Sequence, residues 1–116
     1  MIGSIETLIQ MAHENKCTIG HAMIQYEAKT KQISEKEVVE KMKHNWHVMK
    51  ESVRTGLEEP KCSKGGLIGG EAKTLHDYCV VQPNLLSGRN IMEAVSYSLA
   101  VAEVNATMGR IVACPT

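Results

Sequence analysis

Residues 63–70, SKGGLIGG, are the part of the chain whose composition most directly suggests ligand binding. The glycines leave backbone amides unhindered, and the segment leads into an expected helix. Free amides and the helix dipole both attract anions at a helix start. The segment lacks the G-K-[ST] ending of a Walker A loop, and no strand precedes it as in a dinucleotide fingerprint. Because Glu71 would repel a polyanion, a small carboxylate fits better than a triphosphate, and a plain flexible connector is the alternative. The candidate binding residues here are Ser63, Lys64, Gly65, Gly66, Gly69 and Gly70.

Three polar residues, Glu103, Asn105 and Arg110, interrupt an apolar segment near the end of the chain. Residues 91–102 are apolar nearly all round, which predicts a central, buried helix. Glu103 and Arg110 lie seven residues apart, on one helical face, and are expected to pair or to address one ligand. Because unpartnered buried polar groups are costly, we expect their partners to be each other, the glycine loop, or polypeptide outside this chain.

Histidine and cysteine also occur at helical spacing, which suggests metal binding. The pairs are Cys17 with His21, His44 with His47, and His76 with Cys79, while Cys62 precedes the loop. Each pair can present two ligands from one helical face, but a structural zinc site needs four. No second pair has a recognised spacing, so we assign no metal ligand. No nucleophile–histidine arrangement can be singled out, and the catalytic base stays unassigned.

Charge and composition exclude several classes of function. The 13 basic and 13 acidic side chains cancel, so a nucleic-acid partner is not expected. No apolar run is long enough to span a membrane. The four cysteines are widely spaced and no secretory signal precedes them, which favours reduced thiols and a cytoplasmic protein.

The hydrophobic period is helical along most of the chain, with start signals at Ser4, Thr18 and Ser34. Ser34 and Glu37 form a capping box for a helix that should run to about residue 55 and end at Gly56. The apolar stripe expected to face the core of that helix comprises Val38, Met42, Trp46, Met49 and Val53.

Two more helices are expected after the glycine loop, over about 71–80 and from about residue 89, with Ser87 as the cap of the second. A stripe of small residues on the last helix should admit a neighbouring backbone: Ala94, Ser98, Ala102 and Ala106. With seven Met and no Phe, composition also disfavours a sheet. The sequence thus predicts one all-α domain over residues 1–116: about five helices, a glycine-rich loop before the fourth, and a buried C-terminal helix.

Two segments resemble a known family. The run AVSYSLAVAEVNATMGRIVACPT is similar to the start of the catalytic α region of iron–sulfur-dependent L-serine dehydratases, where an [SA]-E-x-N-A-x-x-G-R-[IV]-V pattern leads into an A-P-T turn. The matching residues are Glu103, Asn105, Ala106, Gly109, Arg110, Ile111, Val112, Pro115 and Thr116. GGLIGG with Lys73 looks like the family's G-L-x-G-G stretch, and the N-terminal helices resemble those of the two-subunit form's α chain. The similarity covers essentially the whole chain.

The resemblance implies an ammonia-lyase that converts L-serine to pyruvate and ammonia, with a [4Fe-4S] cluster as Lewis acid. It implies that the glycine loop and Asn105 contact the substrate, that Arg110 faces its carboxylate or pairs with Glu103, and that Pro115 and Thr116 support the site. It also implies a β subunit or β domain as partner. A non-catalytic helical interaction module is the alternative function.

In the family, a cysteine that binds the cluster follows the A-P-T turn, whereas this sequence ends at Thr116, and Cys114 stands where alanine is usual. The four cysteines do not match the family's ligands, so no cluster and no activity are expected for these residues alone. We therefore expect an N-terminal part of a longer α chain. The apolar last helix also predicts a possible homodimer.

Overall fold

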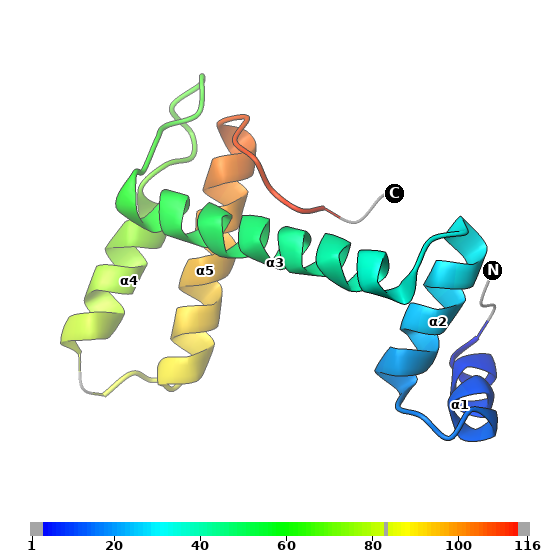
Figure 1. The fold of residues 1–116 in the computed structure, drawn as a ribbon. Coiled ribbons are helices and arrows are strands. Elements are labelled where there is room, and N and C mark those ends of the chain that lie inside the picture. Colours follow the sequence, from blue (N-terminus) through cyan, green and yellow to red (C-terminus); the bar gives the residue numbers. More distant parts are fainter. Residues whose placement is uncertain (1–3, 83, 114–116) are drawn as a thin grey trace. The chain divides into compact units, whose positions relative to one another are not determined.

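The computed structural model describes residues 4–82 and 84–113, and within these residues it is all-helical. The helices are α1 (Ile5–Glu14), α2 (Ile19–Lys31), α3 (Glu35–Glu58), α4 (Glu71–Val81) and α5 (Arg89–Ala106) (Figure 1). The prediction of an all-α fold with the glycine-rich loop before the fourth helix is therefore confirmed.

The chain forms two compact units, residues 1–44 and residues 45–116. In the first unit α1 packs against α2, and in the second α4 packs along α5 (Figure 1). Residues 35–44 of α3 belong to the first unit and residues 45–58 to the second. The single domain expected from the sequence stays a prediction.

Side-chain caps start the first three helices where the sequence predicted them. Ser4 and Thr18 accept hydrogen bonds from the backbone amides of Thr7 and His21. In the capping box, the Glu37 amide donates to Ser34 Oγ at 3.2 Å, and the Ser34 amide donates to Glu37 Oε2 at 2.8 Å. Three of the four predicted caps are thus confirmed.

The predicted cap of α5 is wrong. Gly88, not Ser87, is the N-cap residue, and it makes no side-chain hydrogen bond. Its φ of +80° is a conformation that glycine adopts readily and L-residues with a side chain rarely adopt. Backbone geometry, rather than a hydroxyl cap, therefore determines where α5 begins.

The buried face of α3 differs from the predicted one. Its buried residues are Val48, Ser52 and Gly56, whereas Met42 and Trp46 are 62% and 59% exposed. A Cβ at Gly56 would lie only 2.5 Å from the carbonyl oxygen of Ala100 in α5. The close approach of the two backbones therefore turns the smallest side chains of α3 inward. Gly56 lies inside the helix for this reason, and its prediction as the residue ending α3 is wrong.

The buried face of α5 is also shifted from the expected one. Its buried residues are Ser96, Ala100, Glu103 and Val104. In the predicted small-residue stripe, Ala94, Ser98 and Ala102 are exposed and Ala106 is half-buried. The residue of α5 that lies against the α3 backbone, at Gly56, is Ala100 instead. The C-terminal helix is thus buried along one face and exposed along another.

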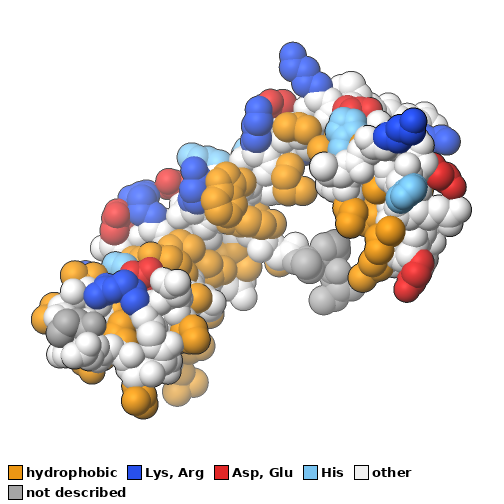
Figure 2. All heavy atoms as spheres, turned by 90° about the horizontal axis from the view of Figure 1, so that it is seen from below, with side chains coloured by type: hydrophobic (Ala, Val, Ile, Leu, Met, Phe, Trp, Pro, Cys, Tyr) orange, Lys and Arg blue, Asp and Glu red, His pale blue; other side chains and the backbone are white. Residues whose placement is uncertain are grey.

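Small side chains also form the buried contacts of the first unit. Ala12 of α1 and Ala22 and Ala28 of α2 are buried, while the larger Ile5 and Ile19 are 73% and 50% exposed. Apolar side chains are visible at the surface of both units (Figure 2). Across the described residues, no helix is long and apolar enough to cross a membrane.

Candidate functional site

A side chain of α5 caps the start of α4. The two carboxylate oxygens of Glu103 accept hydrogen bonds from the backbone amides of Gly70, at 2.9 Å, and Ala72, at 2.8 Å. Glu103 is only 3% exposed. The expectation that the buried polar group finds its partner in the glycine loop is therefore confirmed for Glu103.

A second side chain of α5 binds the other end of α4. The guanidinium of Arg89 donates to the carbonyl oxygens of Cys79, at 3.0 Å, and Gln82, at 3.5 Å. A carboxylate at the amino end of a helix and a guanidinium at its carboxyl end both complement the helix dipole. Two side chains of one helix thus position α4 from end to end.

The glycine loop between α3 and α4 folds around Ser63. The amide of Ser63 donates to the carbonyl oxygen of Ile68, and its hydroxyl accepts from the Ile68 amide. The amide of Gly66 donates to the carbonyl oxygen of Ser63. At Gly69, a Cβ would lie 2.5 Å from the carbonyl oxygen of Lys61. The two ends of the loop are therefore in direct contact, and only glycine fits at that point.

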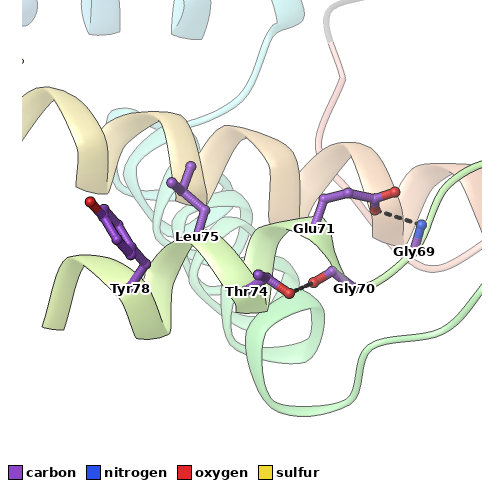
Figure 3. A pocket seen from close by; sticks show the side chains of 6 residues that line it. All are labelled: Gly69, Gly70, Glu71, Thr74, Leu75 and Tyr78. Atoms are coloured by element: carbon purple, nitrogen blue, oxygen red, sulfur yellow. Dashed lines mark hydrogen bonds between the residues drawn. The ribbon is translucent and has the colours of Figure 1, made fainter. Parts of the chain in front are cut away.

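An open hollow lies where the loop joins α4, with a volume of about 550 Å³ (Figure 3). Its lining comprises Gly69, Gly70, Glu71, Thr74, Leu75 and Tyr78. The Glu71 carboxylate accepts from the Gly69 amide at 2.7 Å, and the Thr74 hydroxyl donates to the Gly70 carbonyl oxygen at 2.8 Å. Amides of Glu71 itself and of Gly69 hold the pKa of the Glu71 carboxyl below its ordinary value. The wall of the hollow thus combines polar groups that bond to one another with the apolar side chain of Leu75 and the ring of Tyr78.

A smaller cavity, of about 50 Å³, lies beside Glu103. Its lining comprises Thr55, Gly56, Glu59, Lys61, Glu103, Val104, Thr107 and Gly109. A polar cavity that holds one water molecule needs about 10–15 Å³, so there is space here for water beside the carboxylate. Glu103 therefore connects the end of α3, the start of α4 and the last turn of α5.

Helix α5 ends before Arg110, so Glu103 and Arg110 are not on one continuous helix as the sequence suggested. Met108 has a φ of +62°, and the Gly109 amide donates to the carbonyl oxygen of Val104 at 2.8 Å. This pattern closes a helix in a Schellman motif. Because the helix ends at Ala106, the expected common helical face of Glu103 and Arg110 is wrong. Asn105 and Arg110 are exposed, so their expected burial is wrong as well.

Apart from Asn105 and Arg110, the predicted site residues fall into three groups. Gly70 is hydrogen-bonded to Glu103, and the adjacent Gly69 is hydrogen-bonded to Glu71. Ser63 organises the loop, in which Lys64 is exposed and Gly65 and Gly66 lie with it on the surface. Pro115 and Thr116, together with Cys114, lie outside the described residues.

The sequence reasoning missed Arg89 and Thr74. Arg89 is the first residue of α5, where a positive charge opposes the helix dipole. That unfavourable position was a usable sign that Arg89 serves another element. Thr74 carried no comparable sign, because its hydroxyl bonds a carbonyl oxygen one turn earlier, as threonines in helices often do.

Comparison with known proteins adds to this geometry. The sequence profile described as serine dehydratase alpha chain matches residues 14–116. The chain belongs to this family. Over all 116 residues it is 37% identical to the probable L-serine dehydratase alpha chain of Bacillus subtilis, covering 38% of that protein. It is 27% identical to the L-serine dehydratase alpha chain of Peptoniphilus asaccharolyticus, covering 39% of it. The chain thus spans about two fifths of the length of these relatives. No solved structure matches it.

The two segments on which the resemblance to the serine dehydratase alpha chains rests meet in one contact. The GGLIGG stretch supplies Gly70, and the E-x-N-A stretch supplies Glu103, and these residues are hydrogen-bonded across 33 positions of sequence. Both segments belong to the second unit, residues 45–116. The structure therefore joins in space two motifs that the sequence keeps apart.

The cysteines that the structure describes do not fit an iron–sulfur cluster. Cys17 lies in the first unit, Cys62 is exposed in the loop, and Cys79 is buried in α4. Across residues 4–82 and 84–113, no group of three or more His, Cys, Asp or Glu side chains is placed to hold a metal ion. A cluster needs several thiolates at one point, and these residues do not provide them.

Proposed function

We propose that this chain is part of the α chain of an L-serine ammonia-lyase, which converts L-serine to pyruvate and ammonia. The observation that carries the proposal is the family match over residues 14–116. The printed names of both relatives support the substrate. The contact between Glu103 and Gly70 is a second line of support, because it joins the two motifs that the family shares with this chain.

The iron–sulfur cofactor belongs to the proposal for the full-length enzyme only. The cysteines of the described residues do not fit a cluster, so its ligands would have to come from other polypeptide. We expect these 116 residues alone to bind no cluster and to be inactive. What the described residues would contribute is one wall of the substrate site.

Within that wall, we propose that the glycine loop and the end of α5 face the substrate. The exposed Lys64 ammonium and the neighbouring Gly65 amide are suited to a carboxylate, whereas the Gly66 amide already donates to the carbonyl oxygen of Ser63. The exposed Asn105 and Arg110 would reach the substrate or an adjoining loop from the other motif. The proposed supporting residues are Glu103, Pro115 and Thr116.

We further propose that a β subunit or β domain covers part of this chain. Met42 and Trp46 on α3, and Ile91 and Val95 on α5, are large apolar side chains at least 43% exposed, and such side chains are typical of protein interfaces. On α5, the exposed Ile91 and Val95 also support a homodimer.

The described cysteines are free thiols, as is usual in the cytoplasm, where we place the enzyme. The alternative function is a non-catalytic interaction module, which the exposed apolar side chains on α3 and α5 favour.

Anaerobic assay of the full-length protein tests the proposal. The protein is reconstituted with iron, sulfide and its β partner, and the 2-oxo acid product is measured: pyruvate with L-serine or D-serine, and 2-oxobutyrate with L-threonine. We expect pyruvate from L-serine and none from D-serine, and no pyruvate from residues 1–116 alone. An Asn105→Ala variant should lose most of the activity, whereas Asn15→Ala, at the end of α1, should retain it. A reconstituted protein that binds its partner without forming pyruvate would favour the interaction module instead.

A further inference from the structure

The start of α4 is the position where the sequence suggested that a ligand carboxylate would bind, and the chain fills it with its own carboxylate. Glu103 Oε2 accepts from the Gly70 amide at 2.9 Å, and Oε1 accepts from the Ala72 amide at 2.8 Å. Amides in the first turn of a helix are the groups that bind external anions. Two of these donors therefore already have an internal acceptor.

Burial makes this arrangement hard to displace. Glu103 is 3% exposed and Ala72 is fully buried. A buried carboxylate that lost both amides would have to keep its charge without partners, which is strongly unfavourable. An incoming carboxylate would also meet the negative charges of Glu103 and of Glu71, whose carboxylate accepts from the Gly69 amide. The amides of Gly69, Gly70 and Ala72 at the start of α4 are thus closed to anions from solution.

The same contact determines the conformation of the wall of the hollow. Gly70 has a φ of +96°, and its carbonyl oxygen accepts from the Thr74 hydroxyl at 2.8 Å. Its amide donates to the carboxylate of Glu103 at 2.9 Å. Gly69 and Gly70 line the hollow together with Glu71, Leu75 and Tyr78 (Figure 3). Moving the Glu103 carboxylate would therefore move this wall.

We infer that Glu103 is a positioning residue: its carboxylate replaces a ligand carboxylate at the start of α4 and holds Gly69 and Gly70 in the shape that lines the hollow. A ligand's own carboxylate must then bind away from the first turn of α4. The part of this inference that concerns L-serine rests on the proposed function, whereas the part that concerns the closed helix start does not.

Replacement of the carboxylate, followed by its chemical rescue, tests the inference on residues 1–116. In Glu103→Ala, the amides of Gly70 and Ala72 lose their acceptor, and their proton resonances should move upfield in ¹⁵N-edited NMR spectra. Sodium acetate should then bind in the vacated space and restore both resonances toward their original positions. In the unchanged chain, acetate should leave both resonances where they are. Glu93→Ala, on the same helix but paired with Arg89, is the control and should behave as the unchanged chain.

Two results would overturn the inference: acetate shifting the Gly70 and Ala72 amides of the unchanged chain, or Glu103→Ala leaving both amides in place. If Glu103→Ala does not fold, Glu103→Gln replaces it. A glutamine keeps one acceptor oxygen, so only one of the two amides should move, and movement of neither would contradict the inference.

The full-length enzyme gives a separate readout for the reaction. There, Glu103→Gln should lower kcat by on the order of 10²-fold, the cost of a misplaced site, and change KM less. If kcat and the amount of folded protein fell by the same factor in Glu103→Gln, the role of Glu103 would be purely structural. If acetate restores the resonances in Glu103→Ala but the unchanged full-length enzyme shows no serine-dependent activity, the proposed function is overturned. The inference that Glu103 occupies the start of α4 would still hold.

Discussion

At the scale of single residues, side-chain oxygens accept hydrogen bonds from backbone amides at the starts of α1 to α4, whereas α5 begins at Gly88 without such a bond. Ser34 and Glu37 satisfy two amides at the start of α3 through reciprocal bonds. Glu103 does the same for α4, although it lies 31 and 33 residues away from its partners. The Ser34–Glu37 pair can be found in the sequence from its spacing. The bonds of Glu103 to Gly70 and Ala72 cannot, because no spacing rule indicates which helix start Glu103 reaches.

Replacing the Ser34 cap tests this at a residue whose role the sequence predicted. Ser34→Ala should lower the free energy of unfolding by about 1 kcal/mol, the usual cost of a lost N-cap. Ser87→Ala is the matched control, because the cap of α5 is Gly88, and it should leave stability nearly unchanged. Urea unfolding followed by circular dichroism measures both. An equal loss in the two variants would contradict the assigned caps.

The same cap gives stability a defined pH dependence. The Ser34 backbone amide holds the pKa of the Glu37 carboxyl below its ordinary value, so the carboxylate is favoured in the folded state. This contribution is complete above the carboxyl's pKa in the unfolded chain and is lost as the pH falls through the lowered, folded value. In Glu37→Gln, the free energy of unfolding should therefore fall less steeply as the pH is lowered through the acid range.

At the scale of helices, the sequence predicted the elements well and their buried faces poorly. Helix positions follow from period and capping, which are local. The faces of α3 and α5 depend on which residues let two backbones meet, and Gly56 against Ala100 decides this. Large side chains such as Trp46 were expected inside on hydrophobicity alone, but where the backbones approach each other at Gly56 there is no space for them.

The two glycines of α2 and α3 offer a direct comparison at this scale. Gly56→Ala would bring a Cβ within 2.5 Å of the Ala100 carbonyl oxygen, and overpacking of this kind costs about 1–3 kcal/mol. Gly20→Ala has nothing within 4 Å of the added Cβ and should stabilise the chain by about 0.5–1 kcal/mol through helix propensity. Thermal unfolding monitored by circular dichroism measures both. Stabilisation by Gly56→Ala would contradict the close contact of the backbones.

The candidate site was partly predictable for a related reason. The glycine loop and the polar end of α5 could each be recognised from composition, and the loop was one of the three partners expected for Glu103. The role of the helix start was not predictable: its amides looked available to a ligand, and only the fold shows that a buried carboxylate of the same chain accepts from them. Arg89 was missed because its targets, the carbonyl oxygens of Cys79 and Gln82, lie on another helix.

At the scale of the whole molecule, the two segments that resemble the serine dehydratase alpha chains gather in one of the two compact units. The loop, α4 and α5 all belong to residues 45–116. Within that unit α5 holds α4 by Glu103 at one end and by Arg89 at the other. This unit therefore carries the proposed substrate wall, and its integrity depends on the contact between α5 and the glycine loop.

Hydrogen exchange at the amides of Gly70 and Ala72 tests that contact most directly. Amides in the first turn of a helix have no partner within the helix and ordinarily exchange quickly. With both amides bonded to the buried Glu103, we predict protection comparable to that of the interior amides of α4, measured by NMR on the unchanged chain. Exchange of Gly70 and Ala72 at the rate of an unstructured peptide, while the interior of α4 stays protected, would contradict the account.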